Sequence, residues 1–307
     1  MIEVRAAANE AEAARSNEIY NAVTPRFAFT NEETEAFKDA MLDAEEYLAF
    51  VDGVASASAF TAIRPERPDI AFALVTVLHE HRRRGLGTAL FAAASSWVAA
   101  RNSTEVEGFV DEDDRESIAF VEKRGFRTLK RYERLALDLT ALDDPAAEAV
   151  DGVEVRTWDG DEPTARGIYA VSIEGYRDEP GAAADDAVEP FDEWLEHDIH
   201  RLEESGGATF VARAGDDVVG YAQLTLTLAQ PGTASHSFTA VRRDWRGRGV
   251  AGSLKRAQIV WAKARGLEQL VTQNEERNEP MLRLNARLGY RYDSARLLVR
   301  GPLSGAV

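Results

Sequence analysis

The sequence predicts two tandem domains of the α/β (α+β) class, each built on a mixed sheet. Three observations support this fold class. The chain has 307 residues, enough for two domains that each bury a core. A short segment rich in glycine and arginine occurs twice, once in each half. Each half also shows the same succession of strand-like and helix-like segments.

The glycine- and arginine-rich segment belongs to a long internal repeat. Residues 82–87 (RRRGLG) return 164 positions later as residues 246–251 (RGRGVA), and the same spacing relates Trp97 to Trp261. Upstream, EVR at residues 3–5 returns at 154–156, so the second copy carries about 13 extra residues there. One spacing kept over so many positions indicates a duplication, with a domain at residues 1–139, a polar linker at 140–152 and a domain at 153–307.

The elements of the first copy follow from its hydrophobic periodicity. A strand is expected at residues 2–6, with helices at 10–23 and 32–42. A hairpin turn at Asp52-Gly53 joins the next two strands. In the helix expected at residues 85–100, Leu86, Leu90 and Trp97 share one face. The remaining strands are expected at residues 47–51, 54–61, 70–78 and 105–110, the remaining helices at 85–100 and 115–124, and a final hairpin ends in a strand at 135–139.

The second copy repeats this order. It begins with a strand at residues 153–156. Its antiparallel meander and its interspersed helices predict the same mixed α/β architecture. Further strands are expected at residues 209–213, 218–227, 234–241 and 269–272, and helices at 249–265 and 279–288.

Charge and composition exclude several classes of function. The formal net charge of −17 repels phosphate backbones, so we expect no nucleic-acid partner and a mild preference for a cationic substrate. The absence of cysteine excludes disulfides, thiolate zinc sites and a cysteine nucleophile. His79 and His81 have no third ligand at a familiar spacing, so no metal site is expected. Without an apolar run of membrane-spanning length or a signal-peptide pattern, we expect a cytoplasmic protein with no membrane partner.

The two glycine- and arginine-rich segments have the composition of anion-binding loops. In each copy a strand is followed by R-x-x-G-x-G or R-x-x-G-x-A and then by a helix. Such glycines let backbone N–H groups point outward at a helix N-terminus, where the helix dipole favours a pyrophosphate. The dinucleotide fingerprint G-x-G-x-x-G does not fit, because Leu90 follows Gly87 where a glycine is required. We therefore expect a pyrophosphate loop in each copy, with a solvated turn as the alternative.

These segments resemble the GNAT superfamily of acyl-CoA-dependent N-acyltransferases. Residues 82–87 and 246–251 match its Q/R-x-x-G-x-G/A motif, and residues 114–126 (DRESIAFVEKRGF) and 278–290 (NEPMLRLNARLGY) match its downstream helix and "GF" element. The resemblance covers nearly the whole chain, twice. It implies two tandem GNAT domains that pack as a pseudodimer within a monomer. It also implies acetyl-CoA (CoA) as cofactor and transfer of an acetyl or other short acyl group to a primary amine of a small molecule or peptide.

The resemblance also implies which residues contact acetyl-CoA. The strand before each loop would pair with the pantetheine arm, and the loop amides would hold the pyrophosphate. Asn274 and Asn278 match positions that often contact the cofactor, where the first copy has Val110 and Asp114. The implied cofactor-binding residues are Val75, Val77, Arg82, Arg83, Arg84, Gly85, Leu86, Gly87 and Thr88 in the first copy, and Thr239, Val241, Arg246, Gly247, Arg248, Gly249, Val250, Ala251, Gly252, Asn274 and Asn278 in the second.

One departure from the family concerns the proton donor. Many GNAT enzymes protonate the leaving thiolate with a tyrosine on the last helix, but the matching residues here are Val121 and Asn285. Three options stay open: water supplies the proton, Asn285 hydrogen-bonds the thiolate, or the copy is inactive.

The candidate bases favour the second copy. His236 is the first candidate because histidine titrates near neutrality, and Glu275 is in reserve. His236 reaches the substrate slot only if a bulge re-aims it, since side chains alternate along a strand. In the first copy only Glu107 and Asp111 could supply a carboxylate from the neighbouring strand. If only one copy is active, we therefore expect it to be the second.

Two further functions stay open. The duplicated fold could serve a non-catalytic acyl-CoA-binding or regulatory protein, or a structural pseudodimer with one inactive copy. A fold by itself does not distinguish these functions from catalysis.

Overall fold

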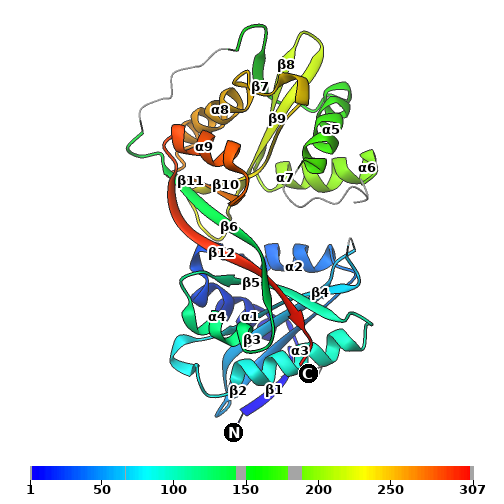
Figure 1. Ribbon diagram of the computed structural model, residues 1–307, viewed down its shortest axis with the longest axis vertical. Coiled ribbons are helices and arrows are strands. Elements are labelled where there is room, and N and C mark those ends of the chain that lie inside the picture. The colour runs from blue at the N-terminus through cyan, green and yellow to red at the C-terminus, as the bar shows by residue number, and fades with distance from the viewer. Residues whose placement is uncertain (1, 66, 143–149, 179–188, 305–307) are drawn as a thin grey trace. The chain divides into compact units, whose positions relative to one another are not determined.

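The computed structural model describes residues 2–65, 67–142, 150–178 and 189–304, which form two compact units (Figure 1). Unit 1 comprises Met1–Arg131 and Ala295–Val307, and unit 2 comprises Tyr132–Ser294. Each unit is a mixed sheet with helices packed on it, as expected. Of the expected linker, residues 143–149 lie outside the described residues.

Unit 1 has a mixed sheet. Among its described residues, β4 and β5 are paired in parallel, and the other neighbouring strands of the unit are antiparallel. Its helices are α1 (Glu10–Val23), α2 (Asn31–Asp39), α3 (Leu86–Ala99) and α4 (Arg115–Glu122). Its strands lie in the order β1 (Ile2–Ala6), β2 (Asp43–Val51), β3 (Val54–Ile63), β4 (Ile70–Val77), β5 (Glu105–Asp111) and β12 (Arg291–Pro302), the last of which begins in unit 2.

Unit 2 repeats this topology. Its strands lie in the order β7 (Glu154–Thr157), β8 (Ala208–Ala214), β9 (Asp217–Leu226), β10 (Thr233–Val241), β11 (Gln269–Glu275) and β6 (Arg127–Asp138), the last of which begins in unit 1. Its helices are α5 (Glu162–Arg177), α6 (Phe191–Trp194), α7 (Arg201–Glu204), α8 (Val250–Ala264) and α9 (Glu279–Arg287). A π-helical turn, Leu195–His200, joins α6 to α7, in the region where the second copy is longer.

The last strand of each sequence copy completes the sheet of the other copy. β12 pairs antiparallel with β5, placing Arg296 opposite Asp111, and β6 pairs antiparallel with β11, placing Leu137 opposite Leu270. The final hairpin expected within each copy is therefore wrong. An antiparallel edge accepts either last strand, and the tandem linkage holds the other copy's strand at high effective concentration. The boundaries at residues 139 and 153 consequently separate the sequence copies, and the compact units divide the chain differently.

In unit 1 the two longest helices cover opposite faces of the sheet. Ile19 of α1 packs with Leu48 of β2, whereas Leu90 of α3 packs with Ala57 and Ala59 of β3. Successive strand residues point to opposite faces, so a strand that is buried at nearly every position, such as β3, fits this double burial.

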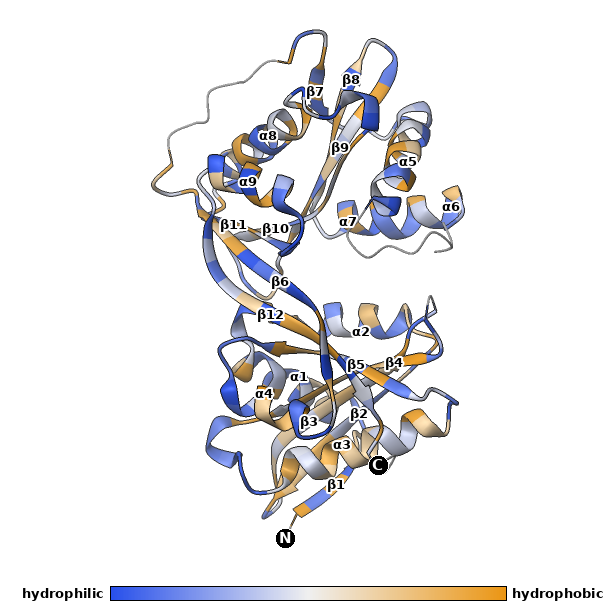
Figure 2. Cartoon of the chain, viewed as in Figure 1, coloured by the Kyte–Doolittle hydropathy of each residue, from blue (hydrophilic) through white to orange (hydrophobic). Residues whose placement is uncertain are grey.

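In unit 2, α5 and α8 cover the two faces in the same way. Ile168 of α5 packs with Val211 and Tyr221, and Leu254 of α8 packs with Ala222 and Leu224. Figure 2 shows apolar and polar residues alternating along α8, as expected for a helix with one side on the sheet. Within the described part of the chain, no helix combines the length and the apolar character needed to cross a bilayer.

Local signals account for most element boundaries. The helix expected at residues 10–23 has these bounds, because Asn9 caps it by accepting a hydrogen bond from the Glu12 amide. A capping box between Thr30 and Glu33 starts α2. β2 begins at Asp43, earlier than expected, because acidic residues at its start do not look like strand residues in the sequence. One of them, Glu46, is nevertheless buried (4% exposed), and its carboxylate lies 3.1 Å from Lys38 Nζ.

The strand exchange makes one prediction. Val299→Pro removes an N–H group from β12 opposite Gly108 and fixes φ, so it weakens the pairing with β5. We expect amide hydrogen exchange to accelerate about tenfold or more in β5 and to stay unchanged in β11. Acceleration in β11 and not in β5 would show that β12 instead pairs within its own sequence copy.

Candidate active site

The two glycine- and arginine-rich loops have the same backbone conformation. Gly85 (φ 90°) and Gly249 (φ 91°) are left-handed at the N-caps of α3 and α8. Two residues earlier, Arg83 (φ 62°) and Gly247 (φ 74°) are also left-handed. Alternating left-handed residues before a helix turn several backbone N–H groups toward one point, which is a concavity for an anion. Both units therefore contain the backbone geometry of an anion-binding loop, and pyrophosphate binding there stays a prediction.

The first arginine of each motif is anchored to the strand before the loop. Arg82 Nε donates to the Val77 carbonyl at 3.4 Å, and Arg246 Nε donates to the Val241 carbonyl at 2.8 Å. Arg82 also lies 2.8 Å from Asp114, which caps α4 by accepting from the Ser117 amide at 3.0 Å. Burial acts to raise the pKa of Asp114, but the hydrogen bonds from Arg82 and Ser117 outweigh it and hold the pKa below its usual value.

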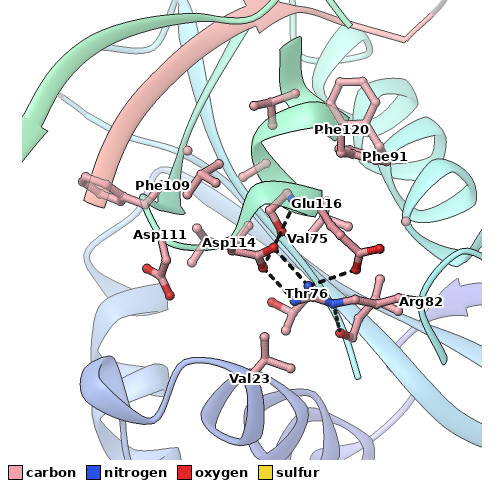
Figure 3. A pocket seen from close by; sticks show the side chains of 18 of the residues that line it. Val23, Val75, Thr76, Arg82, Phe91, Phe109, Asp111, Asp114, Glu116 and Phe120 are labelled. Carbon is pink, nitrogen blue, oxygen red and sulfur yellow. Dashed lines mark hydrogen bonds and ion pairs between the residues drawn. The ribbon is translucent and has the colours of Figure 1, made fainter. Parts of the chain in front are cut away.

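A slit opens between β4 and β5 beside the first loop. The parallel register runs only from Ile70 to Phe72 on β4 and from Glu105 to Glu107 on β5, and then the strands diverge. The slit is part of a cleft of about 490 Å³ that reaches the loop at one end and α1 at the other (Figure 3). Gly108 is required at the divergence, since a Cβ there would lie 2.3 Å from the Ala73 carbonyl oxygen.

Asp111 and Arg296 line the cleft beyond the slit. Asp111 ends β5, and Figure 3 shows its carboxylate pointing into the opening that Val23 of α1 faces from the other side. Arg296 Nε of the exchanged strand lies 2.9 Å from Asp111 Oδ1. Burial raises the pKa of Asp111, and the Arg296 charge opposes this only in part. Asp111 is a candidate from the sequence but Arg296 is not, because nothing in the sequence signals the strand exchange that brings Arg296 there.

The residues of unit 1 fit the acyl-CoA expected from the sequence. The loop offers amides for the pyrophosphate, and the facing edges of β4 and β5 offer backbone groups for a pantetheine arm. Arg124 donates to the Thr88 hydroxyl at 2.7 Å and stacks 3.5 Å over Phe120, which adds a cation beside the loop helix. Of the cofactor-binding residues expected in this copy, all but Arg84 line the cleft: Val75, Val77, Arg82, Arg83, Gly85, Leu86, Gly87 and Thr88.

In unit 2 acidic groups pair with the arginines of the loop region. Asp178 lies 2.6 Å from Arg243 and 2.6 Å from Arg246, and Glu174 lies 3.7 Å from Arg246. Chiefly the hydrogen bond from Arg243, helped by one from Arg246, lowers the pKa of Asp178 to about 2. In this arrangement Arg246 is already neutralised by carboxylates of the same unit.

The structure does not place His236, the first candidate base, in a slot. Its side chain lies under α8, 8% exposed, and its Nε2 hydrogen-bonds the Tyr290 hydroxyl. Burial, reinforced by the Lys255 charge, holds the pKa of His236 well below its usual value. The expectation that the second copy is the active one loses its main support.

A β-bulge explains this outcome. The register of β10 shifts between His236 and Thr239, so one extra residue separates the loop from the start of the strand. A one-residue shift moves side chains to the opposite face of a sheet. At the constant repeat spacing His236 matches Phe72, which packs toward Phe37 and Phe109, yet His236 itself points toward α8. The bulge is present, but it does not turn the imidazole toward a slot.

Four other residues named from the second copy lie near the end of β11. Asn285 is fully buried and donates to Asn274 Oδ1 at 2.7 Å, and within the described part of the chain its own Oδ1 has no hydrogen-bond partner. Glu275 is 7% exposed and pairs with Arg277 at 2.7 Å. Asn278 caps α9 by accepting from the Met281 amide. The structure thus brings Asn274 and Asn285 together, while Glu275 and Asn278 already have structural partners.

A buried polar cluster surrounds His236 in the core of unit 2. Lys255 of α8 is 1% exposed, and its ammonium lies 5.6 Å from the centre of the Tyr290 ring. Gln258 is fully buried beside His236. Burial lowers the pKa of Lys255 to about 7. At the constant repeat spacing, the matching residues of unit 1 are Phe91 for Lys255 and Phe126 for Tyr290.

The chain is similar to a known protein family and to several solved structures. The family model described as the acetyltransferase (GNAT) family matches residues 16–126 and 171–290. A GCN5-related N-acetyltransferase from Sphaerobacter thermophilus is 22% identical with a TM-score of 0.78, covering 98% of this chain and 95% of its own. A tandem GNAT protein from the clavulanic acid biosynthesis pathway is 20% identical with a TM-score of 0.81, and both chains are covered completely. No curated protein sequence is significantly similar to the chain.

The buried Lys255 makes the stability of unit 2 depend on pH. Between pH 7 and pH 10.5 the unfolded chain holds the Lys255 proton and the folded chain does not, so stability rises with pH over this interval. We expect a slope of up to about 1.4 kcal/mol per pH unit in wild type, and a flatter curve with higher stability at pH 7 in Lys255→Met.

Urea unfolding in a Trp97→Phe background measures this effect, because the other four of the five tryptophans lie in unit 2. Lys263→Met, in the same helix, is the matched control and should keep the wild-type slope. If the unfolding free energy of the Lys255 and Lys263 variants depended on pH with equal slopes, Lys255 would not be the source of the pH dependence.

Proposed function

Because the chain belongs to the acetyltransferase (GNAT) family, we propose that unit 1 transfers an acetyl or other short acyl group from acyl-CoA to a primary amine. One observation carries this proposal. A single cleft in unit 1 joins the anion-binding loop to the Asp111 carboxylate through the slit between β4 and β5. Cofactor phosphates, reactive arm and acceptor amine can therefore be bound in one line.

Unit 1 has a role for each part of acyl-CoA, which supplies the thioester carbonyl that an amine attacks. The amides of residues 83–88 would hold the pyrophosphate, with the dipole of α3 behind them. The diverging strands would orient the pantetheine arm as an added strand. Holding the amine beside the thioester converts an encounter of two molecules into a reaction within one complex, which lowers the entropic part of the barrier.

Asp111 is the proposed base. An amine enters as an ammonium ion and must lose a proton before it attacks, and the Asp111 carboxylate is the acidic group that points into the acceptor end of the cleft (Figure 3). Its raised pKa makes it a better proton acceptor than an ordinary aspartate. Val121 cannot donate a proton, so solvent would protonate the departing thiolate.

Two observations support a second function, which is acyl-CoA binding without turnover. The family's usual proton donor is replaced by Val121 in unit 1 and by Asn285 in unit 2. In unit 2, the ring of Phe238 on the bulged strand β10 lies 4.5 Å from the Tyr176 ring and 5.9 Å from the Tyr221 ring, measured between centroids. Aromatic side chains therefore fill the face of β10 that packs against α5. Unit 2 would then bind cofactor or stabilise the fold.

Substitution of the matched loop positions tests which unit acts. Gly87→Glu places a carboxylate where phosphate oxygens would bind in unit 1, and Ala251→Glu does the same in unit 2. We expect thiol release from acetyl-CoA, with a panel of amines, to fall at least about 100-fold in Gly87→Glu and less than about twofold in Ala251→Glu. The reverse pattern would move the activity to unit 2. Calorimetric binding of acetyl-CoA without thiol release from any amine would favour the second function.

The role of Asp111 has its own test. Asp111→Asn removes the proton acceptor and should lower kcat by about 10²–10⁴-fold. It should also remove the acidic limb of the pH–rate profile, which reports the raised pKa of this carboxyl. Asp113→Asn, exposed and outside the cleft, is the control and should keep the wild-type rate. An Asp111→Asn enzyme with an unchanged kcat and profile would refute the assignment.

A further inference from the structure

The acceptor end of the unit 1 cleft carries two opposite charges side by side. Arg296 Nε lies 2.9 Å from Asp111 Oδ1, and the side chains are only 9% and 25% exposed. Neither of these two atoms has a hydrogen bond of good geometry within the described structure, although both are buried. Among the described residues, Asp111 is the only carboxylate that pairs with Arg296. The pair is thus close in space but incompletely satisfied.

A twin pair on the same two strands shows what a purely structural pair looks like. Arg300 lies opposite Glu107, four residues further along each strand and therefore on the same face. Glu107 accepts hydrogen bonds from Arg300 and, at 2.6 Å, from Arg64 as well. Neither Arg300 nor Glu107 lines the cleft. The Arg300 pair is fully bonded inside the protein, whereas the Arg296 pair faces the cleft.

Unit 2 shows that the fold does not require the arginine. Glu275 is the counterpart of Asp111, and the residue opposite it on the exchanged strand β6 is Tyr132. The Glu275 carboxylate pairs instead with Arg277, a neighbour on its own chain segment. Within the described residues, the position opposite the counterpart carboxylate thus holds a cation in unit 1 and a tyrosine in unit 2.

We propose that the acceptor of unit 1 is a zwitterion, an α-amino acid or a molecule ending in an α-amino-carboxylate, with its ammonium on Asp111 and its carboxylate on Arg296. This inference rests on the proposed function of the same site and names its substrate class. In an α-amino acid the two charged groups are attached to one carbon, so their spacing matches two protein charges that lie side by side. Tyr20, Val23 and Phe109 line the surrounding wall and leave room for an apolar side chain.

Charge balance favours a zwitterion over a simple amine. A simple ammonium that binds Asp111 competes with Arg296 and leaves the guanidinium buried without a full partner, which is costly. A zwitterion adds one carboxylate and one ammonium together, so each protein charge gains a partner and neither loses one. Arg296 is held in place for this role, since its guanidinium stacks 4.1 Å over Phe27 and 5.2 Å from Phe109.

Three probes that share a phenyl group test the inference: L-phenylalanine, 2-phenylethylamine and 3-phenylpropionate. Each is titrated by calorimetry into the full-length protein saturated with CoA, and the two amines are also assayed for thiol release from acetyl-CoA. We expect L-phenylalanine to bind at least about tenfold more tightly than either single-charge analogue. Arg296→Gln should reduce L-phenylalanine binding to the level of 2-phenylethylamine, and Arg296→Lys should retain part of the difference.

Arg300→Gln is the matched control, because it removes the same kind of cross-strand pair outside the cleft; it should keep the wild-type preference for L-phenylalanine. Equal binding of L-phenylalanine and 2-phenylethylamine by wild type, loss of all three probes together in Arg296→Gln, or no binding by any common L-amino acid would overturn the inference. Thiol release from acetyl-CoA that is as fast with 2-phenylethylamine as with L-phenylalanine would overturn the inference and leave the proposed function intact. Carboxylate-dependent binding without thiol release would support the zwitterion site and contradict the proposed function.

Discussion

The pairing of β12 with β5 is the interaction on which the candidate site depends. This antiparallel register closes the sheet of unit 1 and brings Arg296 opposite Asp111 and Val299 opposite Gly108. Both β12 residues line the cleft, so a segment from the end of the second sequence copy supplies part of the wall. Backbone hydrogen bonds set the position along the strand, and strand pleating then decides which side chains face the ligand.

The backbone is the same in both units, and the chemistry is not. Each unit has a loop with two left-handed residues before a helix, and in each the parallel strand pair diverges after three residue pairs. Around this common frame, unit 1 places apolar side chains such as Phe91 and Phe126, whereas unit 2 has Lys255 and Tyr290 in a buried polar cluster. A duplicated fold can keep its packing through backbone geometry while one copy changes the side chains on which function depends.

Electrostatics also separate the two loops. Arg82 pairs with Asp114, a residue that already caps α4, whereas Arg246 pairs with Asp178 from the end of α5. The net charge of −17 means that an anionic cofactor approaches an acidic protein, so local amides and helix dipoles must supply the attraction. In unit 1 those amides open onto a cleft lined by Arg83 and Arg124, which is consistent with cofactor binding there.

The family, the duplication, the two glycine- and arginine-rich loops and most helices and strands can be predicted from the amino-acid sequence alone. These features depend on short-range patterns: glycines at left-handed positions, caps such as Asn9 and Thr30, and hydrophobic periodicity along one segment. The folded structure alone shows which last strand completes which sheet, and thus that Arg296 lies beside Asp111. It also decided the face of His236, because one inserted residue in β10 reverses the side on which the imidazole lies. Both outcomes depend on register between distant strands, which no local pattern of residues encodes.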